Sequence, residues 1–283
     1  MPWQTLGTPA PDQLPQTREQ LHCVAQVVAS VPRLLATPTA DFSHSAFDWD
    51  EDRQALISAQ ITIDTTFQVG LRVADATALV LGSDGGEVAS QATNGITIDE
   101  LFAWLTRQIV DLTSSALPKP LIEAEDGLPV PCAAGQRFDL NDTAALAELA
   151  RYYDNTNLVL QQLGAANEHA SPVRTWPHHM DMAMLISLDP DGDPETARSV
   201  SFGMQPGDGF YSEPYYYSSP WPPPEPGDWP ALPGGGHWRT DGFTAAVLVA
   251  SNLTSAGDAA AQQQALQVFA QSAVAANRTL LGA

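Results

Sequence analysis

The order of strand-like and helix-like patterns is the feature that most constrains the fold of this chain. Alternating or apolar runs cluster at 56–82 and again at 178–250, and each cluster is flanked by segments with helical periodicity. Strands that follow one another without a helix between them pair most readily as antiparallel neighbours. The order therefore predicts an α+β fold with an antiparallel sheet covered by helices. It also predicts two similar helix–strands–helix halves, which a duplication would explain.

The expected helices begin at positions typical of helix N-termini. Thr17 is followed by Gln20, and Thr97 by Glu100, which is the spacing of a capping box. A parallel doubly wound fold is less favoured, because no glycine-rich fingerprint follows a strand. The predicted boundaries are an N-terminal arm, an N-terminal half, a linker rich in Pro, Gly and acidic residues, and a C-terminal half, at 1–16, 17–115, 116–140 and 141–283.

Charge excludes two classes of partner. The 283 residues include 12 basic and 33 acidic ones, which gives a net charge of −21. Nucleic acids and anionic membrane surfaces bind clustered Lys and Arg, and this sequence has no such cluster. It also has no apolar run of the length that spans a bilayer. The N-terminal sequence lacks signal-peptide features, and two distant cysteines, Cys23 and Cys132, make no disulfide framework, so we expect a cytoplasmic protein.

The segment 172–241 concentrates residues that bind ligands or do chemistry. It holds three of the six histidines, four of the seven tryptophans and four of the six tyrosines. If 178–188 is a strand, alternation places His179 and Asp181 on one face and a row of methionines on the other. If the run that begins at Glu213 joins the same sheet, Glu213 and Tyr215 lie beside them.

These four side chains support two kinds of site. His179, Asp181 and Glu213 are the ligand types that hold a divalent metal, with His178 and His237 as further candidates. In a metal-free pocket His179 would be a base, Asp181 its orienting partner, Glu213 a second acid and Tyr215 a donor. The alternative is that this polar face is only the solvated face of an antiparallel sheet. The motifs GxSxG, Walker A and HExxH are absent from the sequence.

The same segment resembles an uncharacterised bacterial family of domains of unknown function. The shared pattern is Trp-Pro-x-His-x-Asp, then Pro-Gly-Asp, then Glu-Pro-Tyr, here carried by Trp176, Pro177, His179, Asp181, Pro206, Gly207, Asp208, Glu213, Pro214 and Tyr215. Met180 stands where an aromatic residue is usual. The family has no settled activity, so the resemblance implies no catalytic role.

Two functions follow from the sequence. The first is a small-molecule-binding protein or enzyme with a polar His/Asp/Glu site in an aromatic-rich pocket of the C-terminal half, with or without a divalent metal. The second is a non-enzymatic interaction or structural module that uses the aromatic and Pro-rich surface 211–233. The sequence does not give the reaction, the substrate or the oligomeric state.

Overall fold

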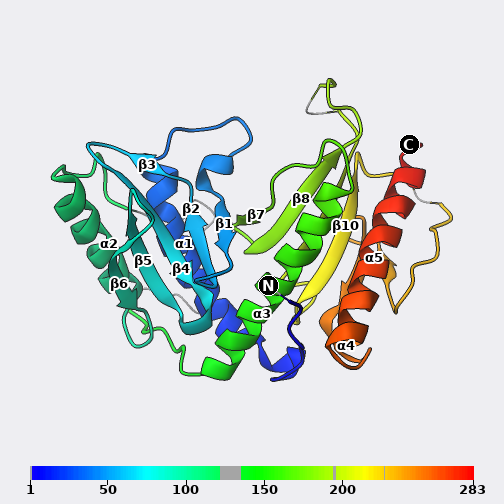
Figure 1. The fold of residues 1–283 in the computed structure, drawn as a ribbon, viewed down its shortest axis with the longest axis horizontal. Helices are drawn as coiled ribbons and strands as arrows, with labels where there is room; N and C mark the ends of the chain where they lie inside the picture. Colours follow the sequence, from blue (N-terminus) through cyan, green and yellow to red (C-terminus); the bar gives the residue numbers. More distant parts are fainter. Residues whose placement is uncertain (1, 122–134, 194–195, 226) are drawn as a thin grey trace. The chain divides into compact units, whose positions relative to one another are not determined.

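The computed structural model describes residues 2–121, 135–193, 196–225 and 227–283 (Figure 1). The chain forms two compact units, and each is made of separate stretches of sequence. Unit 1 comprises Met1–Asp12, Arg151–Val173 and Asp181–Ala283. Unit 2 comprises Gln13–Ala150 and Arg174–Met180. The helices are α1 Pro15–Leu35, α2 Ile98–Thr113, α3 Thr143–Ala165, α4 Ala250–Thr254 and α5 Ala259–Leu280, with short 3-10 turns at Pro11–Gln13, Ser43–Ser45 and Val73–Asp75.

Unit 2 contains an antiparallel sheet in the order β7-β1-β2-β4-β5-β6, with β3 beside β4. Its strands are β1 Phe47–Asp50, β2 Ala55–Ser58, β3 Ile61–Thr62, β4 Thr66–Arg72, β5 Thr77–Gly82, β6 Glu87–Ala92 and β7 Arg174–Trp176. Helix α1 packs against β4 and α2 against β5. Phe47, Phe67 and Leu71 are fully buried in the core of this unit.

The two predicted helix starts in unit 2 have different outcomes. Thr97 caps α2 as predicted, because its hydroxyl accepts from the Glu100 N–H (3.2 Å) while the Glu100 carboxylate accepts from the Thr97 N–H (2.7 Å). Helix α1 instead begins at Pro15, so the box predicted at Thr17 is wrong. Proline is favoured at the first helical position because it has no N–H to leave unpaired.

Unit 1 contains an antiparallel sheet in the order β11-β12-β10-β9-β8. Its strands are β8 Asp181–Ser187, β9 Ser199–Gln205, β10 Tyr215–Trp221, β11 His237–Arg239 and β12 Ala245–Val249. Helix α5 lies along β9 and β10 (Figure 1). The Phe202 and Phe269 rings meet there at 6.2 Å, and Asn277 Nδ2 donates to the Ser218 hydroxyl (2.8 Å). The strands within each unit pair antiparallel, which confirms the α+β class.

The predicted N-terminal arm, 1–16, is not a free arm in the structure. The Leu6 N–H donates to Gln262 Oε1 (2.9 Å), and Gln262 Nε2 donates back to the Leu6 carbonyl (3.1 Å). Trp3 and Leu6 are buried. Apolar side chains and satisfied backbone groups thus make the first residues part of unit 1.

Most of the predicted linker, at 122–134, lies outside the described residues, and Cys132 is among them. Cys23 is buried in α1 and takes part in a disulfide bond, which the sequence did not lead us to expect. At the end of the linker, Phe138 is buried and its N–H donates to the Ile96 carbonyl (2.9 Å). Among the described helices, none is both long and apolar enough to cross a bilayer.

Candidate functional site

The predicted pair His179 and Asp181 does not share a strand. The strand expected from 178 begins at Asp181, and the residues before it form a turn in which the Met180 N–H donates to the Trp176 carbonyl (2.7 Å). Met180 has a φ of 58°, in the left-handed region that interrupts an extended chain. His178 and His179 are exposed in this turn of unit 2, whereas Asp181 opens the first strand of unit 1. The placement on one strand face is therefore corrected.

The turn is held by His22 of α1. His22 Nε2 lies 3.0 Å from the Pro177 carbonyl oxygen, which also accepts from Gln26 Nε2. Burial, together with the smaller effects of the nearby Arg18 and His179 charges, lowers the pKa of His22 from 6.5 to about 4. His22 is thus a partly buried neutral ring.

Asp181 is engaged by a tyrosine from the middle strand of unit 1. The Tyr217 hydroxyl donates to Asp181 Oδ2 at 2.6 Å. Tyr217 on β10, Gly203 on β9 and Ala183 on β8 are directly paired across the sheet. A side chain at position 203 would lie 3.0 Å from Tyr217 Cζ, so the missing side chain of Gly203 lets the tyrosine ring cross β9. Burial and the Asp181 charge raise the pKa of Tyr217 well above 10.

Tyr215 and Glu213 have separate partners. The Tyr215 hydroxyl donates to Asp208 Oδ2 (2.7 Å), and burial followed by this bond raises the Tyr215 pKa. The Glu213 carboxylate accepts from the backbone N–H (2.6 Å) and the hydroxyl (2.9 Å) of Ser251, at the start of α4. The structure therefore places Glu213 against a helix end rather than beside the Tyr217–Asp181 contact.

His237 also pairs with a tyrosine. Its Nε2 lies 2.8 Å from the Tyr211 hydroxyl, and burial and the neighbouring Arg239 charge lower its pKa. Among the residues that the structure describes, no group of three or more His, Cys, Asp or Glu side chains is arranged to hold a metal ion. The predicted ligand set of His179, Asp181 and Glu213 is accordingly not assembled there.

Aromatic side chains gather at the C-terminal end of β10, near Trp221. The Arg239 guanidinium lies 4.1 Å from the centre of the Phe210 ring and 5.2 Å from that of Phe243, which are cation–π distances. Phe210 and Trp221 are 52% and 49% exposed. Beside them is a cavity of about 430 Å³, which we call the Trp221 pocket, lined by Ser219, Pro220, Trp221, Pro223, Thr240, Gly242, Phe243 and Thr244.

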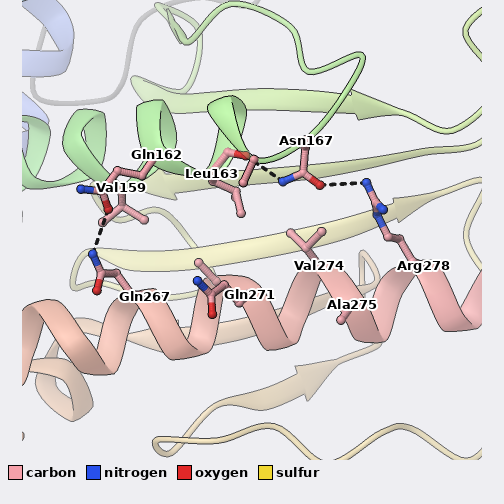
Figure 2. A pocket seen from close by; sticks show the side chains of 11 residues that line it. Val159, Gln162, Leu163, Asn167, Gln267, Gln271, Val274, Ala275 and Arg278 are labelled. Carbon is pink, nitrogen blue, oxygen red and sulfur yellow. Dashed lines mark hydrogen bonds between the residues drawn. The ribbon is translucent and has the colours of Figure 1, made fainter.

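A second cavity of unit 1, of about 440 Å³, lies between α3 and α5 and is shown in Figure 2. We call it the α3–α5 pocket, and its lining residues are Val159, Gln162, Leu163, Ala166, Asn167, Gln267, Ala270, Gln271, Val274, Ala275 and Arg278. Gln267 Nε2 donates to Gln162 Oε1 (2.8 Å) across it, and Arg278 Nη2 donates to Asn167 Oδ1 (2.8 Å) at its other end. The pocket thus has polar groups on both helices above an apolar floor.

Sequence reasoning missed this second pocket. The signal was the polar spacing on the last helix, where Gln267, Gln271 and Arg278 recur at steps of four and seven and therefore share one face. We interpreted both helices only as cover for the sheet. Asp208 was also missed as the partner of Tyr215, although it lies in the Pro-Gly-Asp pattern.

Comparisons of the chain with protein-family models, with curated proteins and with solved structures found no match. The resemblance to an uncharacterised bacterial family therefore stays a prediction, and the function must be argued from the two pockets.

Proposed function

We propose that the chain is a small-molecule-binding protein and that its ligand is an organic acid held in the α3–α5 pocket. One observation carries the proposal: the lining includes a guanidinium and no carboxylate, in a chain with 33 acidic and 12 basic residues. Acidic residues outnumber basic ones by more than two to one in the chain, so a lining with a base and no acid reverses the charge of the molecule as a whole. A lining free of them favours a ligand that is itself an anion.

The hydrogen bonds of Arg278 support this ligand class. The Arg278 side chain makes one hydrogen bond, to Asn167, and no ion pair within the described part of the chain. Its Nε is buried and has no hydrogen-bond partner there. A ligand carboxylate at this end of the pocket would accept from the guanidinium and satisfy the buried donor.

The rest of the lining supports an apolar body on the same ligand. Leu163 and Val274 are buried side chains at the base of the pocket. Gln271 has no hydrogen-bond partner within the described ranges, so its amide is free to bind a polar group of the ligand. The volume of about 440 Å³ is within the range of pockets that hold small molecules.

The proposal is tested with matched pairs of probes. Hexanoate and benzoate are titrated against the full chain, with hexanol and benzyl alcohol as neutral analogues, and binding is followed by ligand-observed NMR. We expect the carboxylates to bind and the Arg278→Gln variant to bind them at least about tenfold more weakly. Arg107→Gln, an exposed arginine on α2 of unit 2, removes the same charge without touching this pocket.

Equal binding of neutral and anionic probes would refute the proposed ligand class. Arg278 also lies in the last turn of α5, where a cation is favoured by the helix dipole. If that were its whole role, Arg278→Gln would lower stability and leave probe affinity unchanged.

Three further expectations from the sequence remain proposals. We infer that the two units descend from a duplication, supported by the long helix that packs on an antiparallel sheet in each, α1 on β4 and α5 on β9 and β10. Catalysis by His179, Asp181, Glu213 and Tyr215 is the second and is separate from the ligand proposal, because none of these residues lines the α3–α5 pocket. A cytoplasmic location is the third.

A further inference from the structure

A second binding site is built around Trp221 in unit 1. Side chains alternate along β10, so Tyr215, Tyr217, Ser219 and Trp221 lie on one face, while Ser218 contacts Asn277 of α5 on the other. The hydroxyls of Tyr215 and Tyr217 are already hydrogen-bonded to the carboxylates of Asp208 and Asp181. Beyond them the row ends at Trp221, whose side chain is 49% exposed at the Trp221 pocket.

The other aromatic side chain of the lining, Phe243, is held in place by two neighbours. The Phe243 ring meets the Phe210 ring edge-on at 5.3 Å, and Arg239 lies over both rings. Gly242 has a φ of 81°, and a side chain there would lie 3.2 Å from Phe210. A glycine is therefore required for the turn that presents Phe243 to the pocket.

The polar part of the lining consists of hydroxyl groups. Ser219, Thr240 and Thr244 line the pocket, and their hydroxyls make no hydrogen bond to any residue that the structure describes. The lining contains no ionisable side chain. Three hydroxyls that can donate and accept, next to an indole and a phenyl ring, do not select an ion. They match a neutral ligand that has both a flat C–H face and many hydroxyls.

We propose that the Trp221 pocket binds a neutral pyranose sugar or a short oligosaccharide. The C–H face of a pyranose ring stacks on the exposed Trp221 indole, and its equatorial hydroxyls reach Ser219, Thr240 and Thr244 at the edge. A cavity of about 430 Å³ has room for one or two sugar rings. Arg239 is a positioning residue, because it holds Phe210 and Phe243 and does not itself line the pocket.

A proline-rich peptide is the other ligand that aromatic grooves bind, through rings that pack on a polyproline helix. The three hydroxyls without protein partners favour the sugar, and binding of a decaproline peptide is retained as an outcome that contradicts the proposal.

The test uses isothermal titration calorimetry on the full chain with glucose, galactose, maltose, cellobiose and decaproline. We expect at least one sugar to bind, Trp221→Leu to weaken its affinity at least about tenfold, and Thr240→Val to weaken it about threefold or more. Phe42→Ala, which removes a 69%-exposed aromatic ring from unit 2, should leave the affinity unchanged. The unchanged far-UV circular dichroism of each variant establishes that it is folded.

Three results would overturn the proposal. They are the absence of binding by every sugar, sugar binding that survives both Trp221→Leu and Thr240→Val, and binding of decaproline in place of sugars. The Arg278→Gln variant separates this site from the α3–α5 pocket. It should bind the sugar like the wild-type protein while losing the carboxylate probes, so either site can fail without the other.

Discussion

Gly203→Ala is the perturbation that most directly tests how unit 1 is packed. The added Cβ would lie 2.7 Å from Ala183 Cβ, 2.7 Å from the Met182 carbonyl oxygen and 3.0 Å from Tyr217 Cζ. The Met182 carbonyl oxygen is a backbone atom of β8 and the Ala183 Cβ is attached directly to that backbone, so neither can move away as the end of a flexible side chain would. The methyl group must therefore separate the strands or displace the Tyr217 ring.

Both responses lower the free energy of unfolding. Overpacking a sheet interior costs about 1 to 3 kcal/mol. Displacing the ring also loses the Tyr217 hydrogen bond to the Asp181 carboxylate, and such charged bonds contribute about 1.5 to 3 kcal/mol. We expect Gly203→Ala to lower the free energy of unfolding of unit 1 by about 3 kcal/mol, measured by urea denaturation with circular dichroism and tryptophan fluorescence.

Two variants make the measurement specific. Gly164→Ala adds the same methyl group in α3, where its nearest neighbour is Met184 Sδ at 3.7 Å, so it should be neutral or stabilising by up to about 1 kcal/mol. Ala183→Gly added to Gly203→Ala removes one of the clashing carbons and should restore part of the loss. If Gly203→Ala unfolds at the wild-type urea concentration, the crossing of β9 by Tyr217 is refuted.

Three further predictions concern other contacts. The pKa of His22 is about 4 in the folded protein and 6.5 when unfolded, so the unfolded chain binds more protons between these pH values. The free energy of unfolding should therefore fall between pH 6.5 and pH 4 by about 2 kcal/mol more than it does in His22→Gln. Parallel pH profiles of the two proteins would contradict this. Asn277→Ala should lower the free energy of unfolding by about 2 to 3 kcal/mol in urea denaturation, because Asn277 Nδ2 donates to the buried Ser218 hydroxyl (2.8 Å) and carbonyl (2.9 Å). If this contact is the cause, Ser218→Ala added to Asn277→Ala should lower the free energy of unfolding only a little further. Thr97→Ala should destabilise α2 by about 1 kcal/mol in thermal melts, and a Thr97→Ser variant that loses as much would exclude the capping hydroxyl as the cause.

The sequence was sufficient for the fold class because periodicity is a local property. The apolar face of Met182, Met184 and Ile186 is buried as alternation requires, and Leu185 between them is 45% exposed. The start of that strand was not predictable with the same rule. In the sequence the alternation extends back through His179, but the left-handed Met180 interrupts it, so the strand begins at Asp181, three residues later than expected.

The candidate site was less predictable because it depends on register and on helix placement. Tyr217 and Asp181 are 36 residues apart, and they meet only because Gly203 lies between them in the paired strands. The spacing of residues in the sequence does not show which residues of neighbouring strands are paired, so it cannot show that a glycine separates Tyr217 from Asp181. The α3–α5 pocket likewise depends on how two helices lie beside each other, and the polar face of each helix by itself is typical of exposure to solvent.

Unit 1 is assembled from stretches that lie far apart in the sequence, which bears on how it folds during synthesis. Leu6 is translated 256 residues before Gln262, the α5 residue with which it exchanges hydrogen bonds. Unit 2 has all of its sequence once residue 180 has emerged. Unit 2 can therefore fold while the segment that contains Trp3 and Leu6 still lacks its partner in α5, and unit 1 must wait for contacts between residues that are far apart in sequence.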